Sequence, residues 1–544
     1  MRILKTLFIL IACAICLPIF AQNDVSKTWV ADLGNGKYKN PILYADYSDP
    51  DVCRVGDDYY MTASSFNSIP GLPILHSKDL VNWTLIGHAI DRMPDYASFK
   101  PEGVNHGGSV WAPAIRYHNG EFYIYYGDPD LGIFMTKTKD PAGEWEPLVL
   151  VKEGQGLIDS CPLFDDDGNA YLVHAYAGSR AGIKSVLAMT RMTPDGKKAI
   201  GNSQIIYEGH DLDPTVEGPK FHKKDGYYYI FAPAGGVATG WQLVLRSKDV
   251  FGPYERKVVM DQGDAKTNGP HQGAWVDTPT GEDWFIHFQD VGAFGRLTHL
   301  QPMEWQSNGW PVIGVDKDGD GCGNPVDTYR KPNVGKVYPK ATPAESDEFN
   351  TNKLGLQWQW HANPMDWWAF TNQEKGYLTL YSVPQPEKMV SLWDVPNLLL
   401  QKSPAPNFTA TMKLTLVPDK RFDGEKTGLV MMGRDYGAIY FTKDKEGYKL
   451  QQVACKDADR GKSEVITGEA TVTDATIYLQ VKVNDKAQCD FSYSTDGKKF
   501  TKLGTTFQAR EGQWIGTKVG TFCLRPVAGN DGGRADIDWF RLTK

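Results

Sequence analysis

Five stretches between residues 49 and 290 repeat one pattern, in which a polar turn leads into a short apolar strand rich in aromatic side chains. The fifth position of each turn-and-strand unit is aromatic, and these anchors are Tyr60, Tyr123, Tyr171, Tyr229 and Phe285. They lie 48 to 63 residues apart, a spacing that suits a four-stranded blade with its loops. The pattern therefore predicts a five-bladed β-propeller. The alternative, a β-sandwich with repetitive hairpins, is disfavoured because sandwiches do not repeat one hairpin cue five times.

A second repeat supports the blades. Residues 76–83, 138–145 and 246–254 each carry a Lys-Asp turn followed by an aromatic residue, at matching positions of three units. Two repeats in the same register are hard to obtain by chance. They favour one radial architecture for this part of the chain.

The pattern stops after Trp305, and residues 331–344 form a stretch rich in Pro and Lys that reads as a linker. Beyond it, short strands alternate with polar turns, and residues 476–483 alternate strictly between apolar and polar. Such alternation is typical of an antiparallel sheet with one wet face, so we expect a β-sandwich that ends with a strand at 535–542. The predicted organisation is a signal peptide at 1–21, a propeller with its linker at 22–340 and a sandwich at 341–544.

Composition agrees with an all-β protein. Aromatic residues make up 12% of the chain, with 16 Trp and 26 Tyr, and Gly and Pro are frequent, which favours many short strands joined by tight turns. The net charge of −8 is spread over interspersed charges of both signs. This gives no electrostatic reason to expect nucleic acid or an anionic membrane as a partner, and a neutral substrate fits better.

The first residues resemble an export signal. A basic start precedes an apolar run from Leu7 to Phe20, and Ala21 offers a cleavage site, so we expect a periplasmic or secreted protein. A lipoprotein-type box at residues 10–13 is the alternative, and it would leave a very short apolar run. No later segment is apolar enough to predict a membrane span.

Six cysteines follow the predicted signal. Buried free thiols are expected for Cys53 and Cys161, which lie in strand-like runs. Cys455 with Cys489 is the one pairing worth testing, because an oxidising compartment permits disulfides.

Candidate chemistry follows from the phase of the repeat. Counting back 11 to 14 residues from each anchor leads to Asp49, Trp111, Asp159, Glu217 and His271. Equivalent positions of radially repeated units converge on one axis, so these residues are expected to meet in one pocket. A lone Asp or Glu would be interpreted as a turn or cap residue. Three carboxyl groups in phase instead favour acetal cleavage, which needs a proton donor together with a nucleophile or a base.

Three segments carry a family resemblance. Asp49-Pro50, Ile158-Asp159 and Glu217-Gly218-Pro219 resemble the signature segments of glycoside hydrolase family 43, over roughly residues 39–315. The region from residue 345 resembles the concanavalin-like, jelly-roll β-sandwich of the xylosidase-type branch. The resemblance implies an inverting enzyme with Asp49 as general base, Glu217 as general acid and Asp159 as the group that raises the pKa of the acid and orients it. Inversion in turn predicts carboxyl groups of Asp49 and Glu217 about 6.5–9.5 Å apart.

The same resemblance implies further site residues. Phe66 and Trp111 match positions that wall the terminal sugar, and Arg296 matches an arginine that binds sugar hydroxyls. Core packing is the alternative for Phe66, and a surface salt bridge is the alternative for Arg296. His271 matches a channel histidine that in many members is the sole protein ligand of a hydrated calcium ion, or that simply forms hydrogen bonds within the channel. A structural Ca²⁺ is therefore possible, while no cofactor is required.

Two acidic features depart from the expected pattern. Asp51 stands where many family members carry serine, and its carboxyl group could affect the base or bond the backbone. The loop at 316–321 copies half of an EF-hand but has Asp327 at the twelfth position, so a polar turn is expected there.

The predicted function is an exo-acting, inverting glycosidase that releases a terminal pentose, β-D-xylose first, from plant cell-wall polysaccharide or oligosaccharide. An α-L-arabinofuranosidase is the near alternative, and an endo-arabinanase is disfavoured by a sandwich that would narrow the pocket. A carbohydrate-binding propeller without activity would have lost a carboxyl group, and the hallmark segments of retaining fructan hydrolases are not found. The sequence leaves the oligomeric state open.

Overall fold

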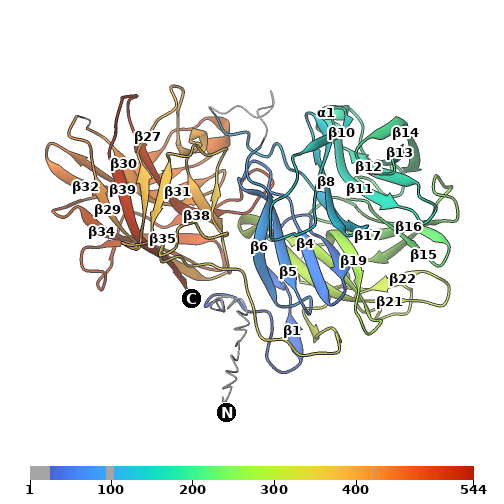
Figure 1. Ribbon diagram of the computed structural model, residues 1–544. Helices are drawn as coiled ribbons and strands as arrows, with labels where there is room; N and C mark the ends of the chain where they lie inside the picture. The colour runs from blue at the N-terminus through green and yellow to red at the C-terminus, as the bar shows by residue number, and fades with distance from the viewer. Residues whose placement is uncertain (1–24, 94–102, 267, 422) are drawn as a thin grey trace, which may run out of the picture.

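The computed structural model describes residues 25–93, 103–266, 268–421 and 423–544, so the predicted signal peptide lies outside the described residues. Strands dominate, and they form two bodies that Figure 1 shows side by side, a propeller in blue to yellow-green and a sandwich in orange to red. The predicted fold, a five-bladed β-propeller followed by a β-sandwich, is confirmed. No helix in the described ranges has the length and apolar character needed to cross a membrane.

Four blades are four-stranded antiparallel sheets built from consecutive strands. Their strands are β3 (Asp51–Val55), β4 (Asp58–Thr62), β5 (Gly71–Ser77) and β6 (Trp83–Ile90); β7 (Pro113–His118), β8 (Glu121–Asp128), β9 (Gly132–Thr138) and β10 (Val149–Glu153); β11 (Leu157–Phe164), β12 (Ala170–Tyr176), β13 (Val186–Met192) and β14 (Ala199–Glu208); β15 (Lys220–Lys224), β16 (Tyr227–Ala234), β17 (Trp241–Ser247) and β18 (Glu255–Met260). A short helix α1 (Gly178–Ala181) follows β12. The aromatic anchors lie in the second strand of each blade, as the repeat predicted.

The fifth blade closes the ring with a strand from the other end of the domain. It consists of β19 (His271–Asp277), β20 (Asp283–Asp290) and β21 (Arg296–Trp305), joined by β2 (Leu43–Asp46) along β21, with β22 (Pro311–Ile313) at the far end of β21 and the turn η1 (Gly292–Phe294) between β20 and β21. Pairing β2 with β21 fastens the start of the domain to its end, which covers the outer side of β21 and closes the ring of blades.

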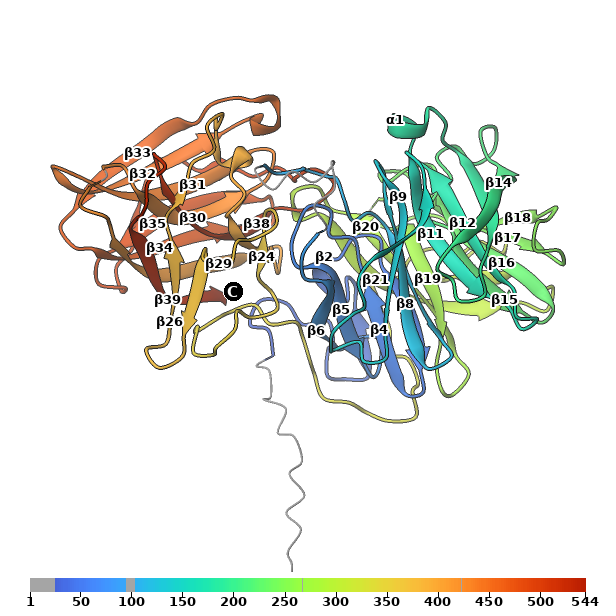
Figure 2. The same ribbon diagram turned by 45° about the horizontal axis from the view of Figure 1, so that its top comes forward.

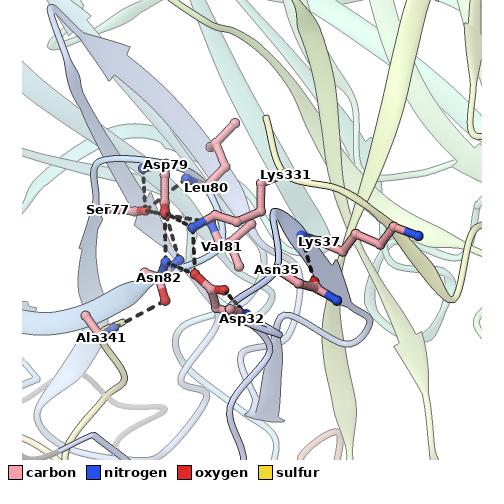
Figure 3. A network of polar contacts seen from close by, with 11 residues as sticks. Asp32, Asn35, Lys37, Ser77, Asp79, Leu80, Val81, Asn82, Lys331 and Ala341 are labelled. Atoms are coloured by element: carbon pink, nitrogen blue, oxygen red, sulfur yellow. Dashed lines mark hydrogen bonds and ion pairs between the residues drawn. The ribbon is translucent and has the colours of Figure 1, made fainter. Parts of the chain in front are cut away.

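A buried polar network adds a second fastening (Figure 3). Lys331 Nζ lies 2.6 Å from Asp32 Oδ2 and 2.7 Å from Asp79 Oδ2. Asn82 Nδ2 donates to the same two oxygens at 2.9 and 2.7 Å. The network therefore joins the segment before β2, the turn between β5 and β6 and the start of the linker. A small sheet adds to this fastening, because β1 (Lys37–Lys39) in the segment before β2 pairs with β23 (Thr328–Arg330), which ends just before the linker.

The sandwich has two mainly antiparallel sheets that enclose an apolar core (Figure 2). The first contains β24 (Gln359–Trp360), β28 (Leu399–Lys402), β38 (Lys518–Arg525), β30 (Lys426–Met432), β31 (Tyr436–Asp444), β32 (Gly447–Cys455) and β33 (Val465–Val472), with β27 (Val383–Pro384) beside β38. The second contains β25 (Ala369–Asn372), β26 (Tyr377–Tyr381), β39 (Arg534–Thr543), β29 (Phe408–Val417), β34 (Thr476–Val483), β35 (Gln488–Ser494) and β36 (Thr501–Lys502), with β37 (Phe507–Gln508) beside β35. Two turns, η2 (Leu392–Asp394) and η3 (Ala458–Arg460), complete this part.

Two local predictions for this region are confirmed. The alternating stretch 476–483 is β34, whose apolar positions face the core, and residues 535–542 lie in the last strand, β39. All six cysteines of the described chain are free thiols, so the considered pairing of Cys455 with Cys489 is wrong in this structure, while Cys53 and Cys161 are free as expected.

Candidate active site

The phased residues converge at one end of the propeller. Asp49, Trp111 and Glu217 come just before the inner strands β3, β7 and β15, whereas Asp159 and His271 lie at the start of β11 and β19. These inner strands are neighbours around the axis. One cavity of about 240 Å³ opens there, and it is lined by Asp49, Phe66, Trp111, Asp159, Glu217 and Arg296, together with Ala112, Ile158, Thr215, Gly236, Val237, Gln272 and Trp514.

The backbone at Asp49 and Asp159 departs from regular strand geometry, which sets the direction of both side chains. Asp49 and Asp159 have φ values of 55° and 56°, in the left-handed region that aspartate tolerates better than most residues. The register of β11 against β12 also shifts between Ile158 and Cys161, a bulge that turns Asp159 out of the regular alternation. Such conformations cost free energy and persist only where the surroundings hold them, which is typical of functional sites.

Asp49 is held asymmetrically. Its Oδ2 accepts hydrogen bonds from the hydroxyl groups of Ser48, at 2.8 Å, and Ser64, at 2.5 Å. Arg296 Nη1 lies 3.2 Å from Oδ1 and 3.4 Å from Oδ2. Because both hydroxyl donors occupy Oδ2, Oδ1 is the oxygen that is freer to accept a proton. This arrangement suits a carboxylate that acts as a base.

Asp159 and Glu217 share a buried environment that disfavours ionisation. Burial, followed by the nearby charges of Asp159 and Asp49, raises the pKa of Glu217 to about 8. Burial and the charge of Asp49 raise the pKa of Asp159 to about 7. Asp159 Oδ2 accepts hydrogen bonds from Gly218 N, at 2.8 Å, and from Gln272 Nε2, at 3.3 Å. A Glu217 carboxyl group that keeps its proton at neutral pH can serve as a general acid.

Aromatic side chains wall the pocket. Phe66 is 2% exposed, has φ 51° and contacts Trp111 edge to face, with ring centroids 6.3 Å apart. Trp111 Nε1 donates to Gly107 O at 2.8 Å, which fixes the indole. Phe66 is therefore both a packed residue and a pocket wall, so the two alternatives for it are compatible.

Arg296 is a pocket residue and not part of a surface salt bridge. Its side chain is 12% exposed and pairs with Asp49. Its guanidinium carbon lies 5.0 Å from the centre of the Phe288 ring and 5.9 Å from that of Trp514. The remaining donors of its planar fork are suited to sugar hydroxyl groups.

Trp514 was not found from the sequence. It belongs to the loop between β37 and β38 of the sandwich, yet it lines the propeller pocket with its ring 6.2 Å from that of Trp111. A Cβ on Gly107 would lie 2.8 Å from Trp514, so this glycine permits the close approach of the loop. Only the docking of the two domains brings Trp514 to the site, and no local motif marks it. Gln272, by contrast, directly follows a phased residue and could have been inferred.

His271 lies beside the pocket, with its Nε2 atom 3.4 Å from Glu217 Oε1. Burial lowers the pKa of His271 to about 3, so the ring is neutral, and neither ring nitrogen has a hydrogen-bond partner in the described structure. Calcium prefers several oxygen ligands, and a neutral imidazole beside one carboxyl group does not supply them. The residues present do not fit a calcium ion held mainly by protein side chains. The metal role of His271 stays a prediction on which no catalytic step depends.

The two acidic departures have structural explanations. Asp51 is fully buried, and its Oδ2 accepts from Ile115 N and Arg116 Nη1, both at 2.7 Å, so it bonds the neighbouring blade. In the 316–321 loop, Asp316 accepts from the backbone N–H groups of Gly319 and Gly321, as in a polar turn. The side chains of Asp316, Asp318 and Asp320 are the one group of three potential metal ligands within the described ranges, and they lie apart from His271.

Comparisons with known proteins agree with this geometry. Residues 38–311 match the model of glycosyl hydrolases family 43, and residues 346–543 match that of the beta-xylosidase C-terminal concanavalin A-like domain. A putative beta-xylosidase of Xylanibacter ruminicola is 38% identical, over 93% of this chain and 89% of its own length. A beta-xylosidase of Formosa agariphila is 33% identical, over 94% and 90%, and a non-reducing end alpha-L-arabinofuranosidase of Bacteroides ovatus is 29% identical, over 94% and 96%.

A solved structure extends the similarity to the whole architecture. The BlXynB protein of Bacillus licheniformis, described as a GH43 protein, superposes with a TM-score of 0.79 at 28% identity, over 93% of this chain and 99% of its own. Both domain models, the relatives and the fold therefore agree. The chain belongs to glycosyl hydrolases family 43 and is a glycoside hydrolase.

Proposed function

We propose that this enzyme removes terminal β-D-xylose from plant cell-wall polysaccharide or oligosaccharide by an exo-acting, inverting mechanism. The observation that carries the proposal is the meeting of Asp49, Asp159 and Glu217 in one pocket of about 240 Å³. This volume is below the ~300–1,000 Å³ of sites for drug-sized ligands, so it suits one sugar ring better than a long chain.

Each carboxyl group receives a role. Glu217 donates its proton to the glycosidic oxygen as the bond from that oxygen to the anomeric carbon breaks. A water molecule attacks the opposite face of the sugar, and Oδ1 of Asp49 accepts the proton that this water loses. Asp159 keeps Glu217 protonated and orients it through the Gly218 N–H. Glu217 is finally protonated by solvent and Asp49 releases its proton, so the cycle needs no cofactor.

Exo action is supported by the wall that the sandwich contributes. Trp514 lines the same pocket as the three carboxyl groups and contacts Trp111 edge to face. A substrate chain that continued in both directions would have to pass this ring. A terminal residue can enter the pocket with its ring against aromatic faces.

We place xylose first because two similar proteins carry that activity in their names. The 38% identical protein is named a putative beta-xylosidase, and the 33% identical protein is named a beta-xylosidase. The 29% identical alpha-L-arabinofuranosidase keeps arabinose release as the second candidate. Pocket residues alone do not separate the two sugars, because both present similar hydroxyl groups.

The test is hydrolysis of an aryl β-xyloside and an aryl α-L-arabinofuranoside by the wild type, by Glu217→Ala and by Glu208→Ala, an exposed control in the same domain. We expect β-xyloside cleavage, its loss in Glu217→Ala and full activity in Glu208→Ala. Proton NMR of the first product should show α-xylose, since inversion reverses the anomeric configuration. First formation of β-xylose would overturn the inverting mechanism, and activity on the arabinofuranoside alone would favour the second candidate.

We also propose that the protein is exported and acts in the periplasm or outside the cell. The support is the basic and apolar start of the sequence, with Ala21 at the expected cleavage site. N-terminal sequencing of the mature protein tests this, and a retained Met1 would contradict it.

A further inference from the structure

Two lysines of the sandwich, one buried and one partly buried, lie side by side and bond the propeller. Lys402 on β28 and Lys518 on β38 are directly opposite each other in an antiparallel pair. Lys518 is 4% exposed, and in the described part of the chain neither lysine forms an ion pair with a carboxylate. Burial lowers the pKa of both amines. Placing two like charges opposite each other away from water costs free energy, so the contacts of each amine must offset that cost.

Lys402 contacts the segment that carries the base. Its Nζ donates a hydrogen bond of 2.6 Å to the backbone carbonyl of Asp46, and it lies 5.1 Å from the centre of the Tyr47 ring. Asp46 is the last residue of β2, and the chain runs from it through two residues to Asp49. The lysine therefore reaches the catalytic segment from the other domain.

The same segment also positions Arg296. Asp46 Oδ1 accepts a hydrogen bond of 2.8 Å from the backbone N–H of Arg296, whose guanidinium pairs with Asp49. Asp46 is thus bonded through its carbonyl to Lys402 and through its carboxyl group to Arg296. Movement of Asp46 would displace both the base and its arginine partner.

We propose that Lys402 is a positioning residue for Asp49, through which the sandwich domain sets the geometry of the base. The inference rests on the proposed role of Asp49. The left-handed φ of 55° at Asp49 must be maintained by its surroundings, and Lys402 fixes the chain three residues earlier. Because a misplacement of about 1 Å can reduce a rate about a hundredfold, loss of this bond should reduce the rate of the chemical step.

Lys518 provides an internal comparison. Its Nζ donates to Ser68 Oγ at 2.5 Å and to Gln359 Oε1 at 2.9 Å. Ser68 belongs to the turn after β4 that carries the pocket wall Phe66, whereas Lys402 bonds the segment before Asp49. Two lysines that face each other on paired strands therefore bond two different parts of the pocket, one next to the base and one next to the sugar wall.

The experiment measures kcat and KM on an aryl β-xyloside for Lys402→Met, Lys518→Met and Asn363→Ala. Methionine keeps most of the length of lysine and removes the ammonium group. Asn363→Ala removes a domain contact outside the pocket, since Asn363 bonds both backbone groups of Met93. Thermal melting and circular dichroism of each variant report the folded fraction.

We expect kcat per folded molecule to fall at least tenfold in Lys402→Met with KM within threefold of the wild type. Lys518→Met, which removes a bond next to the sugar wall, should raise KM and lower kcat less than Lys402→Met does. Asn363→Ala should match the wild type in both constants, although both of these variants should melt at lower temperature. If Lys402→Met does not fold, Lys402→Arg, which displaces the donor nitrogens, should show the same selective loss of kcat. A kcat within twofold of the wild type in the folded variant, or equal losses in all three variants, would overturn the inference.

Asp49→Asn, measured in parallel, separates this inference from the proposed function. If Asp49→Asn is inactive and folded Lys402→Met is normal, only the positioning role fails. If Asp49→Asn remains active, the proposed base is wrong and the inference falls with it.

Discussion

The backbone N–H of Gly218 donates a hydrogen bond of 2.8 Å to Oδ2 of Asp159. Because Gly218 directly follows Glu217, this bond fixes the acid-bearing segment of one blade to the carboxyl group of the preceding blade. The same neighbour supplies part of the negative potential that raises the pKa of Glu217. Asp159 thus affects both the position and the protonation of the proposed acid, which makes the effect of its charge measurable.

Replacing Asp159 by Asn should remove the charge and keep an oxygen for the Gly218 N–H. The pKa of Glu217, now about 8, should fall, so activity should be lost at lower pH as the acid ionises earlier. We expect the alkaline limb of the kcat profile to move down by about one pH unit or more, since one unit corresponds to ~1.4 kcal/mol of interaction. Asp128→Asn, a buried carboxyl group outside the pocket, is the control. An alkaline limb that stays in place would refute this role of Asp159.

Glu217→Gln should make the protein relatively more stable at high pH. The folded-state pKa of about 8 lies above the ordinary glutamate pKa of 4.5, so the folded protein retains a proton that the unfolded chain releases. The stability from this group is complete below about pH 4.5 and is lost as pH rises through about 8. Glutamine does not titrate, so the variant does not lose this stability as the pH rises. The difference in Tm between variant and wild type should therefore shift by roughly 2 °C or more in favour of the variant when the pH is raised from 5 to 8.5. Thermal melts that differ by the same amount at both pH values would contradict the raised pKa.

Ser64→Ala should make Asp49 a less effective base while leaving the shape of the pocket largely unchanged. The Ser64 hydroxyl is one of two that bond Oδ2 of Asp49, and its loss frees that oxygen to turn and to attract water. We expect kcat to fall by about tenfold, on the scale that misorientation of a catalytic group produces. Ser65→Ala is the matched control, because its hydroxyl accepts from Leu72 N and does not bond Asp49. Equal effects of the two substitutions would show that the loss reflects packing of this segment.

Trp514→Ala should affect binding more than chemistry. The indole lines the pocket but forms no hydrogen bond to the three carboxyl groups in the described structure, so we expect KM to rise about tenfold and kcat to stay within threefold. Trp367→Ala is the control, since both tryptophans are 43% exposed and Trp367 does not line the pocket. A kcat that falls as much as KM rises would instead assign Trp514 a part in the chemical step.

Much of the candidate active site could be predicted from spacing. Residues such as Asp49, Asp159 and Glu217 share one phase with the aromatic anchors, and a radial fold converts equal phase into a common location. The residues that hold them could not be found in this way. Ser64 contacts Asp49 across a strand pair, and its sequence context resembles that of many turn residues.

The sequence by itself determined the two β-domains, the five blades and the carboxyl groups at the axis. Strand alternation and the phase of the repeat can be read from short stretches of sequence, and a radial arrangement of blades brings residues of equal phase to the same place. Only the tertiary structure decided that Trp514 walls the pocket and that Lys402 reaches Asp46. These contacts join residues more than 350 positions apart along the chain, and they exist because the surfaces of the two domains pack against each other. The hydrophobic periodicity of one domain carries no information about the surface of the other. How the two domains fit together depends on surface shape and on individual hydrogen bonds, which cannot be read from that periodicity.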